Sequence, residues 1–210
     1  MVIGTCFTVS AFADFYVISA PKEVMPENYA PVEKTGQANC HDSSGSIIIC
    51  TGTGHDGDLQ KGVAWPNPRF TNNSNGTVTD NLTGLIWLKA ADCLSGNTVW
   101  ASALDFCNNL SDGSCLTDGS SAGDWRLPNV RELQSLIHYG VDDPALPNTS
   151  GTGKWATHDP FTNVQSNYYW TSSTAEYYTD YAWCVDMDGG RVTGQDKDSY
   201  RYVWCVRGGN

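Results

Sequence analysis

The chain has 210 residues, a charged fraction of 17% and a formal net charge of −11. This length suits one medium domain with an appendage, or two small domains. An acidic chain repels phosphate backbones and gains nothing from an anionic membrane surface, so we expect neither nucleic acid nor a membrane surface as a partner.

The N-terminal segment and the cysteines indicate export. Residues 1–13 are apolar and end in Ala11-Phe12-Ala13, the small-x-small pattern of a signal-peptidase site, so we expect cleavage before Asp14. The basic residues that normally begin such a segment are missing, as in a truncated signal. The apolar run is shorter than the ~20 residues of a spanning helix, which disfavours a membrane anchor. Eight cysteines indicate an oxidising compartment, so we expect a secreted, periplasmic or cell-surface protein.

Residues 14–64 are predicted to be an extended N-terminal arm that carries one small hairpin. The stretch "SAPKEVMPENYAPVEKTGQ" is rich in proline and polar residues, as in a linker. A short strand at 46–49 lies between Cys40 and Cys50, and a disulfide there would hold together a lobe too small to hold itself. The alternative is a metal site of Cys40, His41, Cys50 and His55, although this spacing matches no common zinc pattern.

The first part of the region after Trp65 predicts a hairpin and then a helix. Turn residues at 75–76 and 83–84 separate two short β-type runs, 77–79 and 85–88. An apolar stripe follows at three- and four-residue spacing, which predicts an amphipathic helix with Cys107 facing the core. The stripe consists of Trp100, Ala103, Leu104, Cys107 and Leu110.

The stretch "GDWRLPNVRELQSLIHYG", residues 123–140, predicts a second, capped helix. Asn129 and Glu132 have the spacing of a capping box, and Gly140 would end the segment in a left-handed conformation. Trp125 is expected in the core with Leu127, and Arg126 is expected to bond loop carbonyls or an acidic side chain. The predicted buried face consists of Val130, Leu133, Leu136 and Ile137.

The last third predicts a long loop followed by antiparallel strands. Residues 141–165 are rich in turn formers, and loops of this length are functional or pinned. β-type runs follow at 168–173, 181–187, 191–194 and 201–207, with Tyr181, Trp183, Val185 and Met187 on one face of the second run. Helices separated from an antiparallel sheet make an α+β domain.

Five sequence words in order resemble a known family. They are "DNLTGLIWLK", "GDWRLPNVRELQSLI", "YYWTSST", "YAWCVDMDGG" and "YVWCVRGG". This arrangement is similar to the C-terminal domain family of bacterial collagen-like adhesins, a domain of unknown function with a C-type-lectin-like fold. The resemblance implies such a domain over 65–210, stabilised by disulfides. The fold hosts many functions, so it is a poor guide to the ligand.

The resemblance also implies cysteine pairs. Relatives carry a pair placed like Cys93 and Cys115, and C-type-lectin-like domains tie the first helix to the last strand, here Cys107 to Cys205. Cys184 would then be free or intermolecular. The alternative is a Cys184–Cys205 bond that leaves Cys107 as a buried thiol.

No motif in the sequence indicates catalysis. His138 is expected to be a partly buried structural histidine, because no histidine stands in a metal or nucleophile pattern. The C-terminal end resembles, faintly, the formylglycine-generating, sulfatase-modifying enzymes, but their chemistry uses two closely spaced cysteines. Cys184 and Cys205 are far apart in sequence. We therefore predict that the protein is not an enzyme and keep that class as an alternative.

Calcium is the one cofactor that the sequence offers. Hard carboxylate ligands on a loop are what Ca²⁺ requires, and residues 55–58, "HDGD", are a second candidate. Neither stretch matches a known coordination loop, so a solvated acidic rim is the competing interpretation. The weak candidate ligands in the C-terminal stretch are Asp186, Asp188, Asp196 and Asp198.

We therefore predict an exported binding or adhesion module with a variable loop face, built by 141–165 and 174–202, for a glycan or extracellular protein. Tyrosines combine aromatic area with polar tips, which suits such ligands. The alternative is a structural subunit of an extracellular appendage, in which self-assembly would use the arm and a leftover cysteine. The predicted ligand-binding residues are Tyr177, Tyr178, Asp180, Asp188, Arg191, Asp196, Asp198 and Tyr200.

Overall fold

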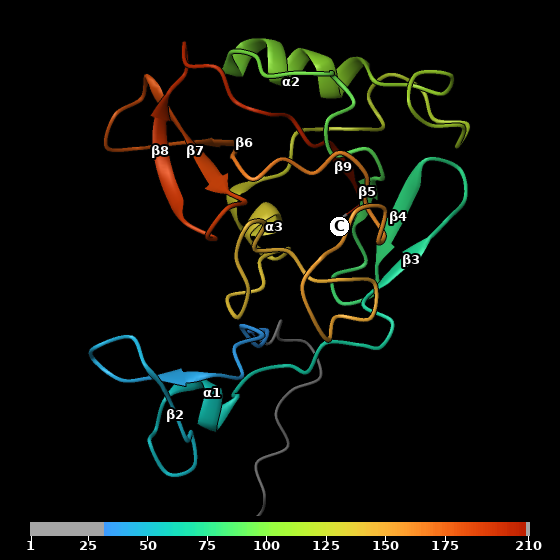
Figure 1. Ribbon diagram of the computed structural model, residues 1–210. Helices are drawn as coiled ribbons and strands as arrows, with labels where there is room; N and C mark the ends of the chain where they lie inside the picture. Colours follow the sequence, from blue (N-terminus) through green and yellow to red (C-terminus); the bar gives the residue numbers. More distant parts are fainter. Residues whose placement is uncertain (1–31, 209–210) are drawn as a thin grey trace, which may run out of the picture. The chain divides into compact units, whose positions relative to one another are not determined.

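The computed structural model describes residues 32–208 (Figure 1). The predicted signal peptide at 1–13 and the start of the predicted arm at 14–31 lie outside the described residues. Among the residues described, no helix is both long enough and apolar enough to cross a membrane.

The first elements form the small hairpin that the sequence predicted. Strand β1 (Cys40–His41) pairs antiparallel with β2 (Ile47–Ile48), and a single helical turn, α1 (Asp56–Leu59), follows. A disulfide joins Cys40 to Cys50. Both strands are only two residues long, so the covalent bond holds a lobe with little apolar surface to bury.

The first larger sheet joins both ends of the domain. Its order is β3-β4-β5-β9, from β3 (Phe70–Asn72), β4 (Thr77–Asp80), β5 (Ile86–Leu88) and β9 (Val206–Arg207), and every pairing is antiparallel. The pairing of β4 with β5 confirms the predicted hairpin. Strand β3 was not predicted, and β9 is shorter than the predicted run at 201–207.

Helix α2 (Trp100–Asn109) carries the predicted apolar stripe. Ala103 and Cys107 are fully buried on it, which confirms that Cys107 faces the core. Disulfides join Cys93 to Cys115, on either side of the helix, and Cys107 to Cys205. These are the pairs that the resemblance implied, and the alternative bond between Cys184 and Cys205 is not formed.

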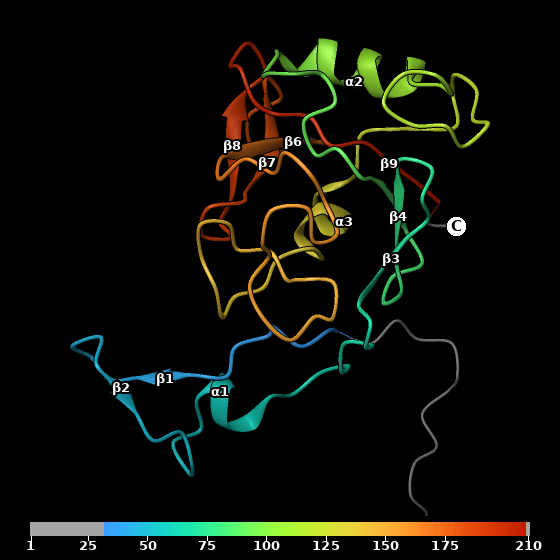
Figure 2. The same ribbon diagram turned by 45° about the vertical axis from the view of Figure 1, so that its right-hand side comes forward.

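Helix α3 (Val130–Gln134) has the predicted capping box. The Asn129 side chain accepts from the N–H of Glu132 at 3.0 Å, and the Glu132 carboxylate accepts from the N–H of Asn129 at 2.7 Å. Arg126 donates to both Glu132 oxygens and to the Gly208 carbonyl, as expected. Figures 1 and 2 place α3 between the two larger sheets.

The expectation for Gly140 was wrong. Its φ is not in the left-handed region. Glycine is needed there for space instead, because a Cβ would lie 2.9 Å from the Gly36 carbonyl oxygen and 2.8 Å from a ring carbon of His138.

The second larger sheet has the order β6-β7-β8, from β6 (Tyr168–Thr174), β7 (Tyr181–Asp186) and β8 (Val192–Asp196). On β7, Ala182 and Cys184 are fully buried, whereas Tyr181 and Trp183 on the opposite face are partly exposed. The predicted alternation therefore holds over 181–184, whereas Val185 and Met187, which were predicted on the same face as Tyr181 and Trp183, are fully buried.

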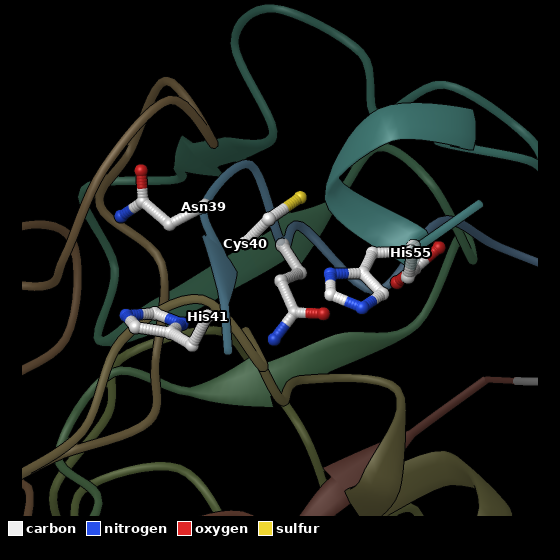
Figure 3. Close-up of a pocket in the computed structure, with 6 residues that line it drawn as sticks. Asn39, Cys40, His41 and His55 are labelled. Carbon is white, nitrogen blue, oxygen red and sulfur yellow. The ribbon is translucent and has the colours of Figure 1, made fainter. Parts of the chain in front are cut away.

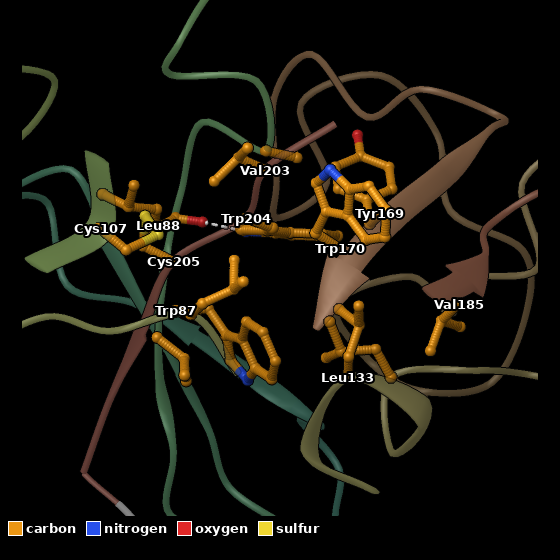
Figure 4. Close-up of a cluster of buried hydrophobic side chains, with 14 of the residues drawn as sticks. Trp87, Leu88, Cys107, Leu133, Tyr169, Trp170, Val185, Val203, Trp204 and Cys205 are labelled. Atoms are coloured by element: carbon orange, nitrogen blue, oxygen red, sulfur yellow. Dashed lines mark hydrogen bonds between the residues drawn. A yellow bond between two sulfur atoms is a disulfide. The ribbon is translucent and has the colours of Figure 1, made fainter. Parts of the chain in front are cut away.

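Four fully buried tryptophans form the centre of the core: Trp87, Trp125, Trp170 and Trp204. The Trp204 ring lies 5.8 Å from that of Trp87 and 4.8 Å from that of Phe161, centroid to centroid. Its Nε1 donates to the Leu88 carbonyl at 2.8 Å, beside the Cys107–Cys205 bond (Figure 4). The predicted core position of Trp125 is confirmed.

The long loop at 141–165 is pinned to the core along much of its length. The Ala145 N–H donates to the Met187 carbonyl at 2.6 Å, and residues 144–147 are buried. Phe161 is fully buried, and the Thr162 N–H donates to the Lys89 carbonyl at 2.8 Å. The chain is thus α+β, with short helices, antiparallel sheets and three disulfides.

Candidate functional site

The turn between β6 and β7 holds two tyrosines in the solvent. Ala175 is buried at its base, donates its N–H to the Tyr181 carbonyl at 2.9 Å and accepts from the Tyr178 N–H at 3.1 Å. The Tyr181 N–H also donates to the Tyr178 carbonyl at 2.9 Å. The backbone of the turn is therefore bonded to itself, and the side chains of Tyr177 and Tyr178 remain 56% and 62% exposed.

Four rings on this side of the sheet contact one another. The Tyr177 ring lies 5.2 Å from that of Tyr178 and 5.6 Å from that of Trp183, and the Tyr178 ring lies 5.7 Å from that of Tyr181. These separations fall within the range of favourable aromatic pairs. We call Tyr177, Tyr178, Tyr181 and Trp183 the aromatic surface.

Gly194 makes room for this arrangement. It lies opposite Trp183 in the pairing of β7 with β8, and a Cβ at this position would overlap the Tyr177 hydroxyl. Because its φ lies outside the left-handed region, the requirement here is for space. A side chain at position 194 would therefore displace the Tyr177 ring.

Four exposed carboxylates lie in the β6–β7 turn and at the end of β8, the segments that adjoin the aromatic surface. Glu176 and Asp180 belong to the β6–β7 turn, and Asp196 and Asp198 lie at and after the end of β8. Asp196 is the direct partner of Tyr181 across the two strands. In the part of the chain that the structure describes, none of the four carboxylates forms an ion pair.

The cations nearest in sequence are already engaged. Lys197 donates its Nζ to the Thr179 carbonyl at 2.8 Å and to Thr174 Oγ1 at 3.1 Å, and lies 4.2 Å from the centroid of the Trp100 ring. Arg201 donates to the Tyr200 carbonyl and to Gln195 Oε1. These acceptors are neutral, so both cations keep their charge, and the four carboxylates outnumber them and leave the surface around the tyrosines net anionic.

The structure divides the predicted ligand face into two groups. Tyr177, Tyr178, Asp180, Asp196 and Asp198 lie at one end of the β7–β8 hairpin, with Tyr200, 61% exposed, shortly after it. Asp188 and Arg191 lie in the β7–β8 turn at the opposite end. Five residue steps along β7 correspond to about 17 Å, which is the separation of the two groups along the hairpin.

Arg191 and Asp188 have structural partners at their own end. Arg191 forms an ion pair with the buried carboxylate of Asp186 at 3.1 Å and donates to the Tyr168 hydroxyl at 3.2 Å. The Asp188 N–H donates to Asp186 Oδ1 at 3.1 Å, and its carbonyl accepts from the Asp143 N–H at 2.8 Å.

The same separation affects the weak calcium candidates. Asp186 and Asp188 lie at one end of the hairpin, and Asp196 and Asp198 lie at the other. Within residues 32–208, no group of three or more His, Cys, Asp or Glu side chains is placed to hold a metal ion. The four aspartates therefore do not come together as a calcium site in this structure.

A pocket of about 290 Å³ lies in the N-terminal lobe, beside the Cys40–Cys50 bond. The imidazoles of His41 and His55 stand apart across it (Figure 3). Asp56 accepts a hydrogen bond from Thr35, and the 55–58 stretch runs into α1. The disulfide removes both cysteines from the metal site considered as an alternative. The pocket is lined by Gln37, Asn39, Cys40, His41, His55 and Asp56.

Cys184 is the free cysteine of residues 32–208, and it is fully buried. Burial raises the pKa of its thiol, first by desolvating the thiolate, with a smaller opposing effect of Arg201. The thiolate is the reactive form, so this sulfur is poorly suited to an intermolecular bond. His138, also predicted to be structural, is buried, and its Nδ1 accepts from the Gly140 N–H at 3.0 Å.

Sequence reasoning missed four parts of the site: Glu176, Tyr181, Trp183 and Gly194. The alternation in "YAWCVDM" placed Tyr181 and Trp183 on one face, and that signal could have joined them to the neighbouring tyrosines. The role of Gly194 depends on a contact between the β6–β7 turn and β8, which local sequence does not reveal.

Residues 76–207 match the profile of the Lcl C-terminal domain family. This range contains β4 to β9, both helices of the main domain and the whole aromatic surface. The N-terminal lobe with its disulfide and pocket lies outside the match. No curated protein matches the chain.

Proposed function

The chain belongs to the Lcl C-terminal domain family, and from this premise we propose that it is a non-catalytic binding or adhesion module at the bacterial cell surface. Its aromatic surface would hold an extracellular glycan or protein. The family suggests a bacterial cell-surface domain, and three disulfides agree with an oxidising compartment.

The observation that carries this proposal is the exposure of Tyr177 and Tyr178 on a rigid support. Both side chains are more than half exposed, yet they contact each other and a second pair of rings. Tyrosine loses little conformational entropy on binding and offers a large face with a polar tip. An ordered group of exposed rings is typical of an interaction surface.

We further propose that the fold is C-type-lectin-like. The support is the combination of two short helices, two antiparallel sheets and a bond from Cys107 in α2 to Cys205, immediately before β9. This is the disulfide between the first helix and the last strand that the resemblance implied. One sheet contains both β3 and β9, and the β6–β7 turn lies at the surface.

The cysteines favour binding over the formylglycine-generating alternative. That chemistry needs two thiols close together, whereas Cys205 is bonded to Cys107 and Cys184 is buried with a raised thiol pKa. The positions of these cysteines therefore favour a binding function over a thiol-dependent oxidation.

The test is binding of the full chain to glycan and matrix-protein arrays, with Tyr177→Ala/Tyr178→Ala as the site variant. We expect at least a tenfold loss of binding for the double variant. Tyr139→Ala is the control, because Tyr139 is 40% exposed but lies against Gly190, in the turn at the opposite end of the β7–β8 hairpin. Equal binding by both variants would contradict the assignment of the site.

A second candidate function, a subunit of an extracellular appendage, is favoured by the N-terminal lobe. Ile47 and Ile49 are 73% and 84% exposed on a hairpin of only two strands, whose outer edges have no partner within the described residues. Such edges invite strand addition by another chain. Light scattering at increasing concentration tests this, and Ile47→Lys/Ile49→Lys should abolish any self-assembly.

A further inference from the structure

We infer that the partner of the aromatic surface is a protein segment that carries lysine or arginine side chains. This inference rests on the proposed function, because it uses the same surface and names the chemistry of what binds there. Three observations support it: the open faces of the rings, the exposed carboxylates beside them, and the absence of any cation of the described chain over these rings.

The rings offer open faces to a cation. A lysine or arginine within about 6 Å of a tyrosine or tryptophan centroid is attracted by the negative face of the ring. This chain uses the interaction internally, since Lys197 lies 4.2 Å from the Trp100 centroid and Arg201 5.6 Å from that of Tyr168. No cation among residues 32–208 lies over a ring of the aromatic surface.

The carboxylates supply the complementary charge. Asp180 directly precedes Tyr181, and Asp196 is paired with Tyr181 across the strands. Glu176 directly precedes Tyr177. These groups are exposed and lack internal cationic partners within the described chain, so an incoming ammonium or guanidinium group would meet both a ring and a carboxylate.

Charge decides between the classes of ligand that the proposed function leaves open. A sulfated or otherwise anionic glycan would approach four unpaired carboxylates on a chain of net charge −11, and such like-charge contact is unfavourable. A neutral glycan would stack on the rings and donate hydroxyl hydrogen bonds to the carboxylates, but its neutral donors would gain less from the four negative charges than an ammonium or guanidinium group would. A basic protein segment satisfies the rings and the carboxylates together.

The experiment measures binding of the full chain to four probes at 50 and 300 mM NaCl. The probes are a ten-residue peptide with four lysines, the same peptide with glutamates, a neutral glucose hexamer and dextran sulfate. We expect only the lysine peptide to bind, with an affinity at least threefold weaker at the higher salt concentration because the contact is electrostatic.

Two charge-matched variants locate the site. Asp180→Asn/Asp196→Asn removes two charges beside the rings and keeps an oxygen at position 196 to accept from the Asp198 N–H. Asp142→Asn/Asp188→Asn removes two exposed charges at the other end of the hairpin. We expect at least a fivefold loss for the first pair, no more than a twofold change for the second, and a loss for Tyr177→Ala/Tyr178→Ala.

Each other outcome overturns a defined part of the argument. Equal losses for the two charge variants would mean attraction by net charge alone, which overturns the inference. A glycan that binds and depends on Tyr177 and Tyr178 would overturn the cationic partner while the proposed function stands. Self-association that depends on these tyrosines would replace the partner by a second copy. Failure of these probes and of the arrays would overturn both.

Discussion

Arg69 and Asp80 form an ion pair in which both side chains are fully buried. Arg69 Nε and Nη2 donate to the two carboxylate oxygens at 2.9 and 3.1 Å, and Nη2 also donates to the Ser135 carbonyl at 2.8 Å. The rings of Trp65 and Phe70 lie 4.6 and 5.0 Å from the guanidinium carbon. Arg69, which directly precedes β3, thus connects the start of this strand to β4 and to the residue after α3.

Removal of the Asp80 charge would leave this buried guanidinium with Glu33, whose carboxylate lies 3.9 Å from Nη2, as its remaining acidic neighbour. We predict that Asp80→Asn lowers the free energy of unfolding by about 3–5 kcal/mol, because breaking a buried pair exposes the full desolvation cost of the remaining charge. Urea unfolding followed by tryptophan fluorescence measures this. Glu176→Gln, at an exposed carboxylate, should change stability by no more than about 0.5 kcal/mol. Similar small values for both variants would contradict the prediction.

Glu33 gives the domain a pH-dependent stability. Its pKa is raised to about 7, first by burial, against an opposing effect of Arg69 and with a smaller repulsion from Asp80. Below pH 4.5 the carboxyl is protonated in both the folded and the unfolded chain, so its contribution to stability is complete. The contribution is lost as pH rises through about 7, because only the unfolded chain releases its proton readily. His138 acts in the opposite direction, because burial lowers its pKa.

We predict that Glu33→Gln removes this dependence. Between pH 5 and pH 8, wild type should lose about 1–2 kcal/mol of unfolding free energy relative to the variant. This range is reduced for solvent screening, because the Glu33 side chain is 29% exposed. Urea unfolding of both proteins at several pH values provides the measurement. Both contain His138, so its effect cancels when the unfolding free energy of the variant is subtracted from that of wild type. A gap that stays constant across this range would show that Glu33 does not titrate near neutral pH.

Single residues differ in how far the sequence reveals them. The roles of Asn129 and Arg126 were predicted because their partner Glu132 lies only three and six residues away. Arg69 gave no signal, since its partners are set by pairing of β3 with β4 and by the approach of residue 135. Local chemistry could be predicted from the sequence, whereas contacts made by the fold could not.

At the scale of the elements, the start of helix α3 depends on one side chain, that of Glu132. Its five residues are too few for a helix to be stable alone, so the cap and its neighbours must hold it. The Glu132 carboxylate accepts from the Asn129 N–H and from both terminal nitrogens of Arg126, at 2.7 Å in each case. It therefore fixes the start of α3 to the segment that pairs with Val206.

We predict that Glu132→Ala is more destabilising than Asn129→Ala. Loss of the Asn129 cap should cost about 1 kcal/mol, whereas loss of Glu132 also releases Arg126 and should cost about 2–3 kcal/mol. Chemical unfolding of both variants checks this order. Arg131→Ala, on the same helix with no side-chain bond to the described residues, should lie within about 0.5 kcal/mol of wild type. The reverse order would assign the main role to the cap alone.

The strands show what periodicity predicts and what it leaves open. Alternation in β7 correctly separated Tyr181 and Trp183 from Ala182 and Cys184, but the pattern does not tell which face lies inward. Residues 185–187 are all buried, on both faces, because the sheet packs against other elements, α3 among them, and that packing comes from the fold. The position of the aromatic surface therefore needed the structure.

At the scale of the whole molecule, strand β9 and one disulfide connect the C-terminal segment to the rest of the domain. Strand β9 pairs with β5, so the C-terminal end completes the sheet begun by β3. The Cys107–Cys205 bond spans 98 residues and attaches α2 to the segment that contains Trp204. The sequence alone allowed two pairings for Cys205. The resemblance implied the pairing with Cys107, and the structure has that bond.

This bond should stabilise the whole domain, whereas the Cys40–Cys50 bond should act only locally. We predict that Cys107→Ala/Cys205→Ala lowers the free energy of unfolding by about 2–5 kcal/mol, because a long loop regains its freedom in the unfolded chain. Cys40→Ala/Cys50→Ala should leave the main transition within about 1 kcal/mol, because only a ten-residue separation is released and the buried tryptophans lie elsewhere.

Two readouts separate these effects. Tryptophan fluorescence during urea unfolding reports the main core, since all four fully buried tryptophans lie between 87 and 204. Limited proteolysis at residues 40–50 reports the lobe. The Cys40–Cys50 variant should be cleaved there while its fluorescence transition stays in place, because two-residue strands cannot hold the hairpin without the bond. If both double variants shifted the fluorescence transition equally, the lobe and the main core would unfold as one cooperative unit.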